Sequence, residues 1–80
     1  MISDRQIGEA CARHGAVKVA EAAYKRLQGD REALAVVGLP DASNLAEAQH
    51  VAAVAYLCMD PEEQAGDTAA AVIDLVRLPR

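Results

Sequence analysis

Hydrophobic residues recur at helical spacing in several segments of the chain, and glycine, proline or aspartate separates one segment from the next. The first segment predicts a helix over 4–13. Ser3 and Gln6 form a capping-box pattern at its start, and Ile2 is placed as a hydrophobic staple. Gly15 suits the position after this helix, where a positive φ angle costs glycine little.

The second predicted helix covers 16–28 and is ended by Gly29. Its inner stripe is expected to contain Ala16, Val17, Ala20, Ala23, Tyr24 and Leu27. The charged residues expected mostly off this stripe are Lys18, Glu21, Lys25 and Arg26.

A third, short helix is predicted over 31–37, with Asp30 as its cap. The β-branched pair Val36 and Val37 leaves a strand as the alternative, but an isolated strand would have no partner. The inward positions of this helix are expected to be Ala33, Leu34, Val36 and Val37.

The fourth predicted helix begins after Asn44, which forms a cap pattern with Glu47, and ends near Met59. It is apolar over most of its circumference, so we expect it to be the central helix. Its expected inner positions are Leu45, Ala48, Val51, Ala52, Val54, Ala55, Cys58 and Met59.

A further helix start follows, with Asp60 as N-cap, Pro61 at the first position and Glu63 at the third. Gly66 interrupts the pattern, and a last helix is predicted over 68–76. The inward residues of the last helix are expected to be Ala69, Val72, Ile73 and Val76. The chain therefore predicts an all-α fold, a compact bundle of about five short helices forming a single helical domain over 1–80.

Composition limits the kind of protein this is. Eighteen of the 80 residues are alanine, so the expected core is thin and could be completed by self-association or by a partner. No run approaches the ~20 apolar residues of a membrane span, and charged residues interrupt the first residues where a secretory signal would lie. Cys11 and Cys58 are too few for a disulfide framework, although their spacing leaves a single bridge open. We therefore expect a cytoplasmic protein with two small, buried cysteines.

The net charge differs in sign between the first part of the chain and the rest. Residues 1–31 carry a net +2 and residues 32–80 a net −6, which gives −4 in total. A cluster of acids surrounds one helix start and contains Asp60, Glu62, Glu63 and Asp67. Acids stabilise helix N-termini, so capping alone explains such a cluster. The functional alternative is an acidic patch that meets a basic partner surface, together with Glu47 and His50 on the polar start of the fourth helix.

The first two helices resemble the two-helix reading unit of DNA-binding repressors. The break at 14–16 and the basic residues Lys18, Lys25 and Arg26 carry this resemblance, which would make those three side chains the DNA contacts. Glu21 departs from the pattern, because an inward apolar residue is expected there. The acidic net charge also argues against direct nucleic-acid binding.

Catalytic and metal-binding motifs give no candidate. Cys11, His14, His50 and Cys58 could ligate zinc by type, but His50 and Cys58 would lie about 12 Å apart along one helix. No nucleophile and base pair, carboxylate pair or phosphate-binding loop stands out. We therefore expect no enzyme activity, no cofactor and no metal.

In its size, its Met1-Ile2-Ser3-Asp4 helix start, its acidity and its lack of a catalytic motif, the chain resembles small phage and prophage accessory proteins, of which anti-CRISPR inhibitors are one group. The resemblance is one of type and transfers no site residues. It implies a non-enzymatic protein-binding module that regulates or inhibits a partner, such as a nucleic-acid-binding complex, by surface occlusion. The alternatives are a helix-turn-helix DNA-binding regulator and a self-associating structural or assembly subunit.

Overall fold

The computed structural model describes residues 1–77, and side chains as far as Asp74. Its elements are α1 (Asp4–His14), α2 (Ala16–Leu27), the 3₁₀-helix η1 (Ala33–Val37), α3 (Leu45–Cys58), α4 (Pro61–Gln64) and α5 (Asp67–Arg77). Over these residues the fold is all-α, with five α-helices and no strand, which confirms the predicted fold class.

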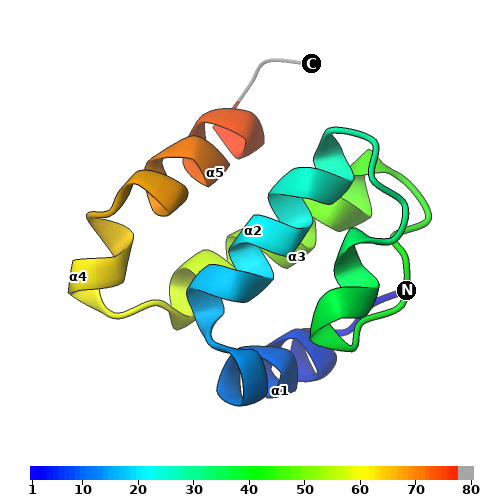
Figure 1. The fold of residues 1–80 in the computed structure, drawn as a ribbon, viewed down its shortest axis with the longest axis horizontal. Helices are drawn as coiled ribbons and strands as arrows, with labels where there is room; N and C mark the ends of the chain where they lie inside the picture. The colour runs from blue at the N-terminus through cyan, green and yellow to red at the C-terminus, as the bar shows by residue number, and fades with distance from the viewer. Residues whose placement is uncertain (78–80) are drawn as a thin grey trace.

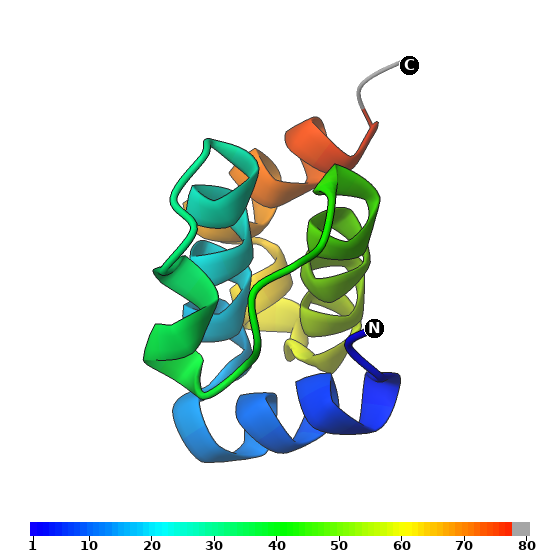
Figure 2. The same ribbon diagram turned by 90° about the vertical axis from the view of Figure 1, so that its right-hand side faces the viewer.

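Helices α2 and α3 form the centre of the molecule and run antiparallel, side by side (Figure 1). Helix α1 crosses below both of them, as the view turned by 90° shows (Figure 2). Helix α5 packs along α2 and α3 on one side, and η1 packs against α2 on the other. The central position expected for the fourth predicted helix is therefore shared by α2 and α3.

Local capping determines where the helices begin. The Ser3 Oγ accepts from the Gln6 N–H at 3.1 Å, and the Gln6 side chain accepts from the Ser3 N–H at 2.8 Å. Asn44 caps α3 through a 2.9 Å bond from the Glu47 N–H. Gly15, the single residue between α1 and α2, has a φ of 94°, which side chains rarely allow. The predicted starts of α1 and α3 and the predicted turn are thus confirmed, whereas the third helix begins at Ala33, two residues later than predicted, and has no side-chain cap.

Substitution of Asn44 by alanine is expected to lower the free energy of unfolding by about 1 kcal/mol, because the first turn of α3 loses its side-chain acceptor. Urea denaturation followed by circular dichroism measures this change. Ser43→Ala, one residue earlier on the same exposed loop, is the matched control and should have little effect. Equal losses in both variants would show that the loop, and not the cap, is responsible.

Small side chains dominate the core. Ten of the twenty residues in the buried cluster of the described chain are alanines, which confirms that alanine occupies the inner faces of the helices. The largest fully buried side chains include Ile2, Ile7 and Leu34. Because an alanine side chain removes little apolar area from water, most of the hydrophobic stabilisation rests on these few larger residues.

The structure corrects three positions expected to be inward. Val36 is exposed, because a 3₁₀-helix has three residues per turn and so aligns Leu34 with Val37 while Val36 faces away. Leu45 and Cys58, the first and last residues of α3, are also exposed, since a helix end has packing neighbours on one side only. The expected inward position of Val76 lies outside the described side chains.

Candidate protein-binding surface

Helix α4 follows the end of α3 and packs against α5. Met59 is buried and turns the chain, and Asp60 then caps α4 by accepting from the Glu63 N–H at 2.8 Å. Gln64 donates from its side chain at 3.1 Å to the Tyr56 carbonyl at the end of α3, which also accepts from the Met59 N–H. These bonds hold the acidic residues of α4 in a fixed place at one end of the bundle.

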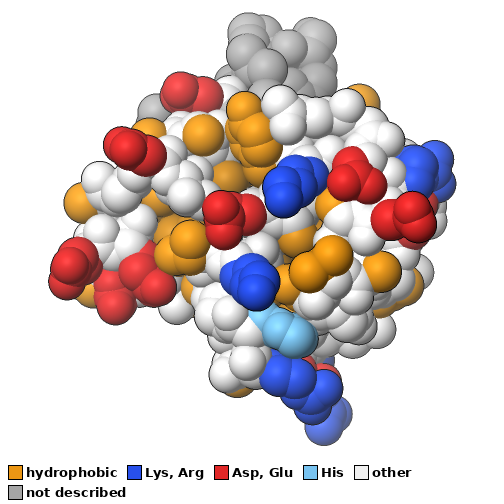
Figure 3. All heavy atoms as spheres, in the orientation of Figure 1, with side chains coloured by type: hydrophobic (Ala, Val, Ile, Leu, Met, Phe, Trp, Pro, Cys, Tyr) orange, Lys and Arg blue, Asp and Glu red, His pale blue; other side chains and the backbone are white. Residues whose placement is uncertain are grey.

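This acidic corner consists of Asp60, Glu62, Glu63 and Asp67. Two of its side chains, Asp60 and Glu63, also form the reciprocal capping box of α4, as the sequence predicts. The salt bridges among the described side chains all lie elsewhere, so none neutralises a carboxylate of the corner. Figure 3 shows acidic side chains gathered over α4, whereas Lys and Arg side chains lie over α1 and α2.

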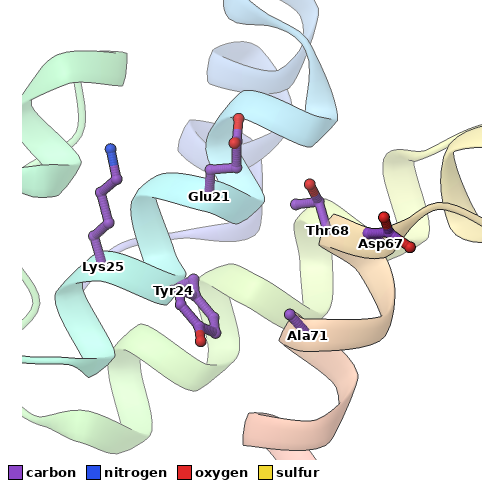
Figure 4. Close-up of a pocket in the computed structure, with 6 residues that line it drawn as sticks. All are labelled: Glu21, Tyr24, Lys25, Asp67, Thr68 and Ala71. Carbon is purple, nitrogen blue, oxygen red and sulfur yellow. The ribbon is translucent and has the colours of Figure 1, made fainter.

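A groove runs between α2 and α5 beside this corner. Its volume is about 290 Å³, and its lining residues are Glu21, Tyr24, Lys25, Asp67, Thr68 and Ala71. Figure 4 shows the first three residues along α2 and the last three along the facing helix α5. Tyr24 is half-buried against the core and gives the groove an aromatic wall. Asp67 belongs to both the groove and the acidic corner, so the two features form one continuous surface.

Glu47 and His50 lie toward the other end of α3. The Glu47 carboxylate accepts from the Ser43 N–H at 3.0 Å and from the Ile2 N–H at 3.3 Å. The bond from Ser43 lowers the pKa of Glu47 most, burial opposes this, and the bond from Ile2 lowers it further. His50 forms an ion pair with Asp4 of α1 when it is protonated. The structure therefore does not bring Glu47 and His50 together with the acidic corner, and Glu47 holds the N-terminal segment in place.

The three basic residues proposed as DNA contacts differ in their exposure to solvent. Lys18 and Lys25 are exposed, but Arg26 is buried. Its guanidinium donates to the Asp41 carboxylate at 2.7 Å and to the Ala42 carbonyl at 2.9 Å. The expectation that Arg26 lies off the inner stripe is therefore wrong, because the loop before α3 supplies an acid that compensates its charge in the interior. The three side chains do not form one exposed basic cluster.

The cysteines and histidines, considered next as possible metal ligands, are not brought together in the described part of the chain. Among the described residues, no group of three or more His, Cys, Asp or Glu side chains is placed to hold a metal ion. Cys11 is buried in the last turn of α1, whereas Cys58 is exposed at the end of α3.

Comparison of the chain with known protein families, with curated proteins and with solved structures finds no match. Among the described residues, no helix combines the length and the apolar character needed to cross a bilayer.

Proposed function

We propose that this protein is a non-enzymatic binding module that regulates or inhibits a protein partner by covering part of the partner's surface. The observation that carries the proposal is the continuity of the acidic corner with the α2–α5 groove through Asp67. Clustered carboxylates that form no salt bridge repel one another, and a basic partner surface would remove that repulsion. The groove beside them would accept an apolar side chain of the same partner.

A partner that is complementary to the acidic corner and the groove carries lysine or arginine around an apolar residue. Nucleic-acid-binding proteins present such basic surfaces, so occupation of one would block nucleic-acid access without any chemical step. Small phage accessory proteins of the anti-CRISPR type, which this chain resembles in size and acidity, include inhibitors that act in this way. The groove supplies the apolar part of the contact, and the corner supplies orientation and a fast association rate.

The test compares capture of partner proteins from the native host lysate by two charge variants. Glu62→Lys with Asp67→Lys changes the proposed surface and leaves the Asp60–Glu63 capping box intact. Capture of the specific partner should fall at least about tenfold, equivalent to about 1.4 kcal/mol, and the capture by the wild type should weaken as salt is added.

Glu9→Lys with Glu32→Lys is the matched control, because it makes the same change of net charge at exposed positions of α1 and of the turn before η1. This control should retain capture. If both pairs of substitutions reduce capture equally, net charge alone is responsible, and if neither reduces it, the surface is not the binding site. Circular dichroism of each variant verifies that the helices are intact.

A further inference from the structure

Helix α3 is mostly apolar on the side that faces solvent as well as on the side that faces the core. Its inner side packs against α1, α2 and α5. Its outer stripe is exposed at three positions and half-buried at the fourth, and consists of Ala46, His50, Ala53 and Leu57. A helix that is apolar around its circumference is normally covered on all sides. Among the described residues, nothing covers this stripe.

The outer stripe looks out from a broad face of the molecule. The Cα atoms extend over 31 × 30 × 18 Å, and α3 lies behind α2 along the shortest dimension (Figures 1 and 2). A face 31 by 30 Å across offers about 700 Å² to a partner, close to the ~800 Å² that each partner buries in an interface of standard size. The α2–α5 groove is lined by exposed residues of α2 and is not part of this face.

A projecting side chain and a recess lie at the two ends of the stripe. Leu57 is 76% exposed, which makes it the most exposed large apolar side chain of α3. At the other end, a recess of about 290 Å³ is lined by Met1, Asn44, Ala46, Glu47 and His50. His50 and Leu57 are two helical turns apart, so the recess and Leu57 lie on the same side of α3.

We propose that the outer stripe of α3 binds a second copy of this chain in a two-fold symmetric, antiparallel dimer. A two-fold axis between His50 and Ala53 places Leu57 of each copy opposite Ala46 of the other copy, at the recess. The same axis places His50 of each copy opposite Ala53 of the other. A larger side chain therefore meets a methyl group at every level of the stripe, which is the self-complementarity that such an interface requires.

The charges of the chain favour this arrangement. Two copies each carry a net charge of −4 and repel one another, but the outer stripe contains no carboxylate. The acidic corner follows the Leu57 end of α3, so an antiparallel pair places the two corners at opposite ends of the dimer. Each corner then lies toward the N-terminus of the other copy's α3, whose partial positive charge attracts acids. A parallel pair would instead bring the two corners together.

In this dimer both α2–α5 grooves stay accessible, because the interface uses the other side of the central helix pair. The dimer would therefore present its binding surface twice. The inference does not rest on the proposed function, since self-association is measured on the isolated chain without any other protein. Failure of either proposal leaves the other standing.

Sedimentation velocity of the full-length chain between about 5 and 500 µM tests the inference. The expected result is a reversible equilibrium between monomer and dimer with a Kd on the order of 10 µM, because the interface does not exceed standard size. A chain that remains monomeric at the highest concentration would overturn the proposal, and the apolar face would then belong to a different partner. A trimer or larger assembly would also contradict two-fold closure.

Two variants test the face and its register. Leu57→Lys and Ala46→Glu should each raise the Kd at least about tenfold, because each puts an unpaired charge into the interface. Val36→Lys is the matched control, since Val36 is 66% exposed but lies on η1, which packs against α2. This control should dimerise like the wild type. An equal loss in the control, or none in the two variants, would show that the outer stripe is not the interface.

Mixing Leu57→Lys with Ala46→Glu tests the antiparallel pairing itself. Each mixed dimer would contain one contact between the introduced lysine and the introduced glutamate, and one native contact between Leu57 and Ala46. Association should therefore recover in the mixture, although neither variant dimerises well alone. Absence of recovery, with both variants folded by circular dichroism, would overturn the proposed pairing.

Discussion

Replacement of Arg26 by alanine is expected to lower the free energy of unfolding by about 3 kcal/mol, because it removes a large buried side chain together with its hydrogen bonds. The Arg26 side chain is 6% exposed and bonds both the Asp41 carboxylate and the Ala42 carbonyl. In the variant, that carbonyl loses its partner in the interior, and the aliphatic stem of Arg26 leaves a void. Urea denaturation followed by far-UV circular dichroism measures the loss.

Arg31→Ala is the matched control for this prediction. Arg31 bonds the other oxygen of the same Asp41 carboxylate at 2.6 Å, but its side chain is 65% exposed. An exposed pair contributes about 0–1 kcal/mol, so the loss should be small. Equal losses for the two arginines would mean that the charge on Asp41, and not the burial of Arg26, determines the effect.

The same ion pair makes stability depend on pH. Burial alone would raise the pKa of Asp41, but hydrogen bonds from Arg31 and Arg26 outweigh it and hold the pKa below its ordinary value. A carboxyl with a lowered folded-state pKa stabilises the protein above its unfolded-state pKa, and this stabilisation is lost as the pH falls through the folded-state value. Stability should therefore decline below about pH 4, and Arg26→Ala should decline less steeply.

Helix starts were predictable because capping is local. Ser3 and Gln6, or Asp60 and Glu63, are three residues apart, and their hydrogen bonds require only the geometry of one helical turn. Helical spacing likewise identifies inner positions such as Ile7 and Val51, both of which are fully buried. These properties depend on neighbours along the chain.

Arg26 could not be placed in the same way. Its position on α2 is compatible with the interior, but a charge there is tolerated only because Asp41 comes close from a different segment. The exposure of Val36 follows from the choice of a 3₁₀-helix over an α-helix, a difference of one residue in hydrogen-bond spacing that propensities do not resolve.

The candidate surface likewise has one part that could be predicted from the sequence and one part that could not. The acidic corner is visible in the sequence because Asp60, Glu62, Glu63 and Asp67 are close neighbours in the chain. The groove beside it is not, since its walls come from α2 and α5, which are separated by almost half of the chain. Local spacing therefore locates the charge, and only tertiary packing locates the recess that the charge borders.

Alanine has a particular role where α2 meets α3. Ala20 and Ala23 on α2, and Ala48, Ala52 and Ala55 on α3, are all fully buried. Side chains this small let two helix backbones approach closely and leave little room to accommodate additional atoms. Because of these small side chains the core buries little apolar area, so the stability of the protein depends on how closely α2 and α3 fit together.

Ala52→Leu is therefore expected to destabilise the protein by about 2 kcal/mol, even though it adds apolar atoms. Leucine forms helices almost as well as alanine does, so the loss would come from overpacking against α2. Ala46→Leu, at an exposed position of the same helix, is the matched control and should change the free energy of unfolding by no more than about 0.5 kcal/mol. Urea denaturation measures the free energy of unfolding of both variants. A gain in stability for Ala52→Leu would contradict the prediction. It would mean that the contact between α2 and α3 contains unfilled space, and that alanine is there for a reason other than close packing.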